Sequence, residues 1–66
     1  MSLYEYRESQ ALERQDAGFY SLIMAAMRRA DDVNIGKLKH AWPEVWQELE
    51  ARYNAPGGLL PGENDT

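Results

Sequence analysis

Three side chains that could bind a metal or transfer protons are spaced at four-residue intervals: His40, Glu44 and Glu48. On one unbroken helix this spacing would place an imidazole and two carboxylates on the same side. Pro43 lies between His40 and Glu44, and a proline disfavours helical backbone at the residue before it. A di-metal bundle also needs paired Glu-x-x-His motifs from several helices, which this chain lacks. The pattern therefore predicts a solvated histidine and capping or surface glutamates, with no metal site.

A second candidate is the oxygen-rich run Asp32-x-Asn34-x-Gly36, which begins like a calcium-binding loop. In such a loop the glycine stands at position 6 and a bidentate glutamate at position 12. Here the glycine comes one position early, and Pro43 stands where the glutamate is required. Helix capping is the better interpretation of these side chains.

Nucleophilic catalysis requires a serine, cysteine or threonine activated by a nearby base. The chain contains no cysteine, and its single histidine is far in sequence from the serines Ser2, Ser9 and Ser21. A chain of 66 residues also offers little material for a pocket that excludes water. We expect no enzyme activity, no catalytic residue, no cofactor and no small-molecule substrate.

The first two structural elements of the chain are predicted to be helices. Ser2 and Glu5 have the spacing of a capping box, which predicts a first helix over about residues 3–15. Its apolar residues are scattered around the axis, so it could dock as an arm on a neighbouring molecule. Asp16 is the expected N-cap of a second helix from Ala17 to Ala30. The apolar residues of that helix cover an arc of roughly 200°, which needs two or more packing neighbours and makes the helix central.

The second half of the chain predicts two further helices separated by a proline. Asp31 or Asp32 caps a short helix that ends at about Ala41. Pro43 suits the first position of a new helix, which continues to Tyr53. The expected fold is therefore all-α, a small bundle of three or four short helices around the central helix. Residues 1–54 form the single domain, and residues 55–66 read as a flexible tail.

Charge is unevenly spread over this acidic chain, whose formal net charge is −4. Residues 1–16 carry four acids against two arginines, whereas residues 28–42 carry four basic side chains against two aspartates. A helix-turn-helix reading would bring Lys37, Lys39 and His40 into a major groove, as the runner-up interpretation of function. The net negative charge argues against nucleic acid as a partner. The nucleic-acid candidates are Arg28, Arg29, Lys37, Lys39 and His40.

The heavy load of aromatic and methionine residues favours packing in a core, with a binding surface that contacts protein as the alternative. A domain of this size buries only about 60% of its unfolded surface, and this chain has no disulfide to support it. We therefore expect a homo-oligomer, a dimer in the simplest case, or binding to another protein. The candidates for the protein interface are Tyr20, Met24, Met27, Trp42, Trp46 and Tyr53.

The runs FYSLIMAAMRRAD, N-x-x-KL and AWPEVWQELEARYNAPGG cover residues 19–58. This stretch resembles small uncharacterised helical proteins of phage, prophage and bacterial genomes. The resemblance implies an accessory or regulatory protein, and it brings no activity or functional residue with it. The longest nearly apolar run, from Phe19 to Met27, is shorter than the roughly 20 residues that a bilayer requires. We expect a cytoplasmic protein without a membrane partner.

Overall fold

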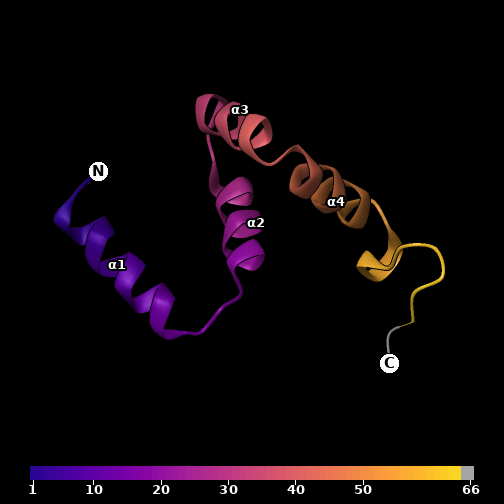
Figure 1. Ribbon diagram of the computed structural model, residues 1–66, viewed down its shortest axis with the longest axis horizontal. Coiled ribbons are helices and arrows are strands. Elements are labelled where there is room, and N and C mark those ends of the chain that lie inside the picture. Colours follow the sequence, from indigo (N-terminus) through magenta and orange to yellow (C-terminus); the bar gives the residue numbers. More distant parts are fainter. Residues whose placement is uncertain (65–66) are drawn as a thin grey trace.

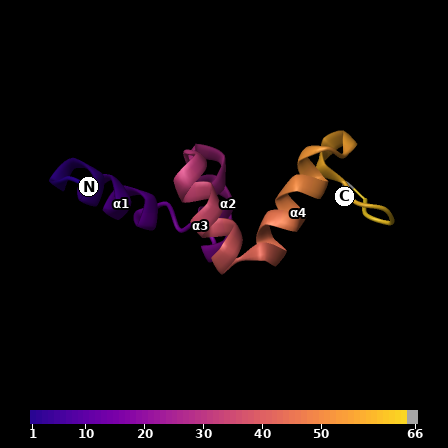
Figure 2. The same cartoon turned by 90° about the horizontal axis from the view of Figure 1, so that it is seen from above.

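The computed structural model describes residues 1–64, and these residues form helices and turns without a β-strand. The helices are α1 (Leu3–Arg14), α2 (Phe19–Arg29), α3 (Asp32–Ala41) and α4 (Pro43–Tyr53), followed by a short 3₁₀ helix, η1 (Pro56–Gly58). The protein is therefore all-α, as the sequence predicts. Helices α2, α3 and α4 contact one another, and η1 contacts α4. Within residues 1–64, α1 packs against none of the other elements and stands apart in both views (Figures 1 and 2).

Local capping explains where two of the helices begin. The Ser2 side chain accepts a hydrogen bond from the backbone N–H of Glu5 at 3.2 Å and starts α1. Asp31 does the same for the N–H of Asn34 at 2.8 Å, so this aspartate rather than Asp32 caps α3. These bonds satisfy donors that have no partner in the first helical turn.

The predicted start of α2 is wrong. The residue that precedes the helix is Gly18, and Asp16 lies in the preceding turn with a φ of 58°. Aspartate tolerates this left-handed conformation better than most residues do. It closes the end of α1, because its N–H donates to the carbonyl of Glu13 at 3.1 Å. Asp16 therefore belongs to the C-terminal end of the first helix, and α2 begins two residues later than the expected Ala17.

A small apolar core joins α2 to α4. Met27, Val45 and Leu49 are its only buried residues within the described chain, each less than a tenth exposed. Ile23, Ile35 and Leu38 are half-buried around them. Much of the broad apolar arc of α2 stays in solvent, because the neighbouring helices cover only one side of it. Its first turns expose Phe19, Tyr20 and Leu22.

The segment after α4 folds back on that helix. Gly57 and Gly58 have φ values of 63° and 71°, a left-handed conformation that glycine adopts without steric cost. Leu60 is half-buried as a result. The flexibility predicted for residues 55–66 stays a prediction, and residues 65–66 lie outside the described part of the chain.

Pro43 separates α3 from α4 as the sequence predicts. Trp42 has φ −133° and ψ 65°, which is not helical, and Pro43 occupies the first turn of α4. The carbonyl of Trp42 accepts from the N–H of Trp46 at 3.2 Å, so the new helix starts at once. The two helices are consecutive but differently directed (Figure 2).

Replacing Pro43 by alanine should change the free energy of unfolding by no more than about 1 kcal/mol, because a proline at this position gives up no helical hydrogen bond. Urea unfolding followed by tryptophan fluorescence measures the effect. A loss of several kcal/mol, with helix content unchanged by circular dichroism, would mean that the proline ring makes a necessary packing contact.

Candidate functional site

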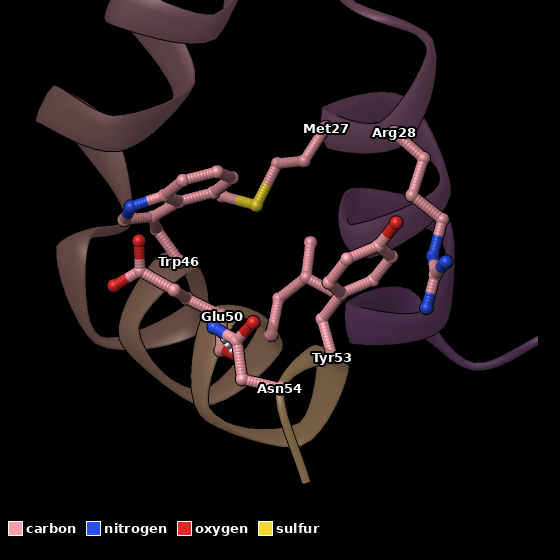
Figure 3. Close-up of a pocket in the computed structure, with 7 residues that line it drawn as sticks. Met27, Arg28, Trp46, Glu50, Tyr53 and Asn54 are labelled. Carbon is pink, nitrogen blue, oxygen red and sulfur yellow. Dashed lines mark hydrogen bonds between the residues drawn. The ribbon is translucent and has the colours of Figure 1, made fainter. Parts of the chain in front are cut away.

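A concave surface lies between the C-terminal end of α2 and helix α4. It has a volume of about 440 Å³, and we call it the α2–α4 groove (Figure 3). The groove is lined by Met27, Arg28, Trp46, Leu49, Glu50, Tyr53 and Asn54.

The base of this groove is apolar and its edges are polar. Met27 and Leu49 are buried at 4% and 6% exposure, and the sulfur of Met27 points toward the Trp46 indole (Figure 3). Sulfur next to an aromatic ring is a favourable contact. Arg28 stands on the α2 side and Glu50 on the α4 side, with charges of opposite sign. Tyr53 is 76% exposed and offers a broad aromatic surface at the edge.

A second concave surface lies on another side of α4 and contains a residue of the C-terminal segment. It is lined by side chains of α2 and α4 together with Leu60 and has a volume of about 610 Å³. Tyr20 and Met24 contribute from α2, and Val45 contributes from α4. The apolar side chain of Leu60 thus shields part of the surface that α2 and α4 leave open there.

Arg52 holds the C-terminal segment in place through a cluster of charge-assisted hydrogen bonds. Its Nη1 donates to the Gly58 carbonyl at 2.8 Å and to Glu63 Oε1 at 2.7 Å, and its Nη2 donates to Glu63 Oε2 at 2.9 Å. The two-pronged pairing of a guanidinium with a carboxylate is the strongest geometry for such groups. Arg52 also pairs with Glu48 at 3.3 Å, one helical turn away on α4.

Sequence reasoning missed the contact between Arg52 and Glu63, which are eleven residues apart. The pKa of Glu63 falls to about 2, first because Arg52 donates to its carboxylate and second because the Leu60 N–H also donates to it. The pKa of Arg52 rises for the same primary reason. The sequence feature that could have indicated this contact is the pair of glycines after Pro56, because they permit the chain to reverse toward α4.

The six predicted interface residues do not form one surface. Met27, Trp46 and Tyr53 meet in the α2–α4 groove, where Met27 is part of the core. Tyr20 and Met24 line the other concave surface. Trp42 is half-buried and packs edge-to-face with Phe19, at 6.1 Å between ring centroids.

The predicted basic cluster is also divided. Arg28 lines the α2–α4 groove, whereas Arg29 and Lys37 line a hollow of about 490 Å³ between α2 and α3. Lys39 lies over the Trp46 ring at 4.3 Å from its centroid, a cation–π contact that shields the indole. His40 is exposed near the end of α3.

The residues considered for metal chemistry are separated or engaged elsewhere. His40 and Glu44 lie on different helices, α3 and α4, and Glu48 pairs with Arg52. Asp32 and Asn34 belong to the first turn of α3 and not to an open loop. Within residues 1–64, no cluster of three histidine, aspartate or glutamate side chains could hold a metal ion. No helix in this part of the chain has the length and apolar character needed to cross a membrane.

Comparison with known proteins gave no match among family models, curated proteins or solved structures.

The contact of Glu63 with Arg52 should make the attachment of the C-terminal segment sensitive to strong acid. A carboxyl with a lowered pKa stabilises the folded contact fully above its unfolded pKa of about 4.3, and this stabilisation is lost as pH falls through the folded pKa. The Leu60 amide chemical shift, followed by NMR from neutral to acid pH, should therefore titrate near pH 2. In the control variant Glu63→Gln this transition should disappear. A midpoint near the ordinary glutamate pKa would contradict the contact.

Proposed function

We propose that this protein is a non-enzymatic binding module that acts by associating with a second copy or with another protein. The observation that carries the proposal is the isolation of α1, which contacts no other element within residues 1–64. A helix of 12 residues is marginal in water when nothing packs against it. A partner molecule would supply the missing contacts. The large apolar side chains that α1 exposes are Leu3, Tyr4, Tyr6 and Leu12.

The dimensions of the chain support the same proposal. Its radius of gyration is 14.0 Å, whereas a compact domain of this length is expected to have about 11 Å. Its accessible surface is 5746 Å², and a folded monomer of this mass exposes about 4,300 Å². The excess of roughly 1,400 Å² matches the roughly 1,000–2,500 Å² that each chain buries in an obligate dimer.

A narrower proposal rests on the resemblance of residues 19–58 to small helical proteins of phage, prophage and bacterial genomes, to which the comparisons with known proteins add no support. The module would serve as an accessory or regulatory factor of such an element in the cytoplasm. The identity of the genes that flank its coding sequence tests this part of the proposal.

Binding to duplex DNA is the second candidate function. Arg29 and Lys37 favour it, because they line the same hollow between α2 and α3. Three observations weigh against it: the net charge of −4, the acidic side chains of Asp31 and Asp32 at the turn, and the length of that turn. Only Ala30 and Asp31 separate the two helices, whereas a helix-turn-helix turn has about three or four residues.

Self-association predicts a solution mass of about twice 7.6 kDa at micromolar concentration. Because dissociation and unfolding are linked in such a dimer, a hundredfold dilution should lower its stability by about 2.7 kcal/mol and reduce the melting temperature. Sedimentation equilibrium and thermal melts at several concentrations measure both effects. The mass of one chain together with a constant melting temperature would exclude self-association as the mode of action.

Because DNA binding is the second candidate function, we expect no sequence-dependent binding to duplex DNA at about 0.15 M salt. Weak attraction at low salt is compatible with the ranking, since a few exposed lysines and arginines neutralise phosphates without reading bases. Fluorescence anisotropy, with a random pool of DNA duplexes and with sequences selected from that pool, measures the affinity. Submicromolar binding that depends on sequence would place DNA binding first.

A further inference from the structure

Two surfaces of the chain lack a covering partner: the helix α1 and the α2–α4 groove. Helix α1 has no buried residue. The groove is open, with the indole of Trp46 half-buried and the ring of Tyr53 exposed. Every molecule contains both surfaces, so two copies related by a twofold axis could cover one another twice.

We propose that α1 of each copy docks in the α2–α4 groove of a second copy, so that two chains exchange their N-terminal helices. The inference rests on the proposed self-association and adds the segment and the surface through which it occurs. A helix seated in a groove of its partner is a common mode of recognition.

The arrangement of side chains on α1 matches the groove. Tyr4, Ala11 and Leu12 follow the spacing i, i+7, i+8, so they share one side of the helix with Glu8. This side supplies an aromatic and two aliphatic groups for the apolar base formed by Met27 and Leu49. The Glu8 carboxylate lies between Tyr4 and Leu12, and Arg28 is the basic side chain of the groove lining that it would need as a partner.

The charges flanking this side of α1 also complement the edges of the groove. Arg7 lies on one flank of this side of α1 and Glu5 lies on the other, as their positions on a helix with 3.6 residues per turn require. The groove has Glu50 at its α4 edge and Arg28 at its α2 edge. One orientation of the docked helix therefore pairs Arg7 with Glu50 and Glu5 with Arg28.

Exchange between copies fits the direction of α1 in the single chain. Helices α1 and α4 lie at opposite ends of the molecule (Figures 1 and 2). The link from α1 to α2 spans residues 15–18 and includes the left-handed backbone of Asp16, with an N–H that bonds to the end of α1. A short link that directs a helix away from its own body favours docking on another copy.

Photo-cross-linking of the full chain tests the exchange. Because the sequence contains no cysteine, an Ala11→Cys variant can carry a single benzophenone label on the docking side of α1. The labelled chain is mixed with an equal amount of ¹⁵N-labelled chain, and cross-linked peptides are identified by mass spectrometry. The expected product joins α1 to a ¹⁵N peptide of α2 or α4. The matched control, Val33→Cys, places the label on an exposed position of α3 and should not reach the groove.

The outcomes separate the exchange from self-association in general. A dimer whose cross-links join α1 to its own chain, or to α1 of the second copy, would overturn the exchange and leave self-association standing. A single-chain mass would overturn both. Sedimentation of the same samples distinguishes these cases.

Charge reversal provides a second test. Its expected result would not be seen if Arg7 and Glu50 only stabilised the fold of their own chain. Glu50→Arg and Arg7→Glu should each weaken the dimer several-fold, because each places like charges opposite one another. The double variant Glu50→Arg with Arg7→Glu should recover most of the lost affinity. Additive weakening in the double variant would show that these two side chains do not meet.

Discussion

The packing of Met27 from α2 against the stripe of Val45 and Leu49 on α4 is the constraint on which the rest of the molecule depends. These three side chains are the buried core of the described residues. They set how α2 and α4 cross, and α3 and η1 are placed by their own contacts with α4. A core this small stabilises only a small folded unit. Large apolar side chains therefore remain at the surface, because no interior is available to hold them.

Several of these side chains are shielded by neighbours at the surface instead. The Phe19 ring lies against Trp42, and the Lys39 ammonium covers part of Trp46. Both contacts leave the tryptophans half-buried, which is less costly than full exposure and requires no additional core. The two tryptophans are thus accommodated within one chain on either side of the break at Pro43.

The two concave surfaces beside α4 differ in what covers them. One of them receives Leu60, because Arg52 binds Gly58 and Glu63 and keeps the C-terminal segment against the helix. The lining of the α2–α4 groove contains no residue beyond Asn54. The chain thus covers part of one side of α4 with its own C-terminal segment and leaves the α2–α4 groove open.

The sequence by itself determined the helices, because the signals that begin and end them are local. Ser2, Asp31 and Pro43 act within one helical turn of their own positions, and the all-α class follows from such patterns. The scattered apolar residues of α1 agree with its lack of contacts to the other elements of residues 1–64. One local signal misled: Asp16 suits an N-cap, but it closes α1 instead.

Only the tertiary structure decided which apolar and charged side chains meet. Helical periodicity shows which residues share a side of one helix, but it does not say how two helices cross. Met27 therefore became core while Tyr53 stayed exposed, although both were candidates for an interface. The pairing of Arg52 with Glu63 was hidden for the same reason, because it depends on a chain reversal at Gly57 and Gly58 and not on helical spacing. Contacts between elements arise from their crossing angles and turns in space, which residue spacing along the chain does not specify.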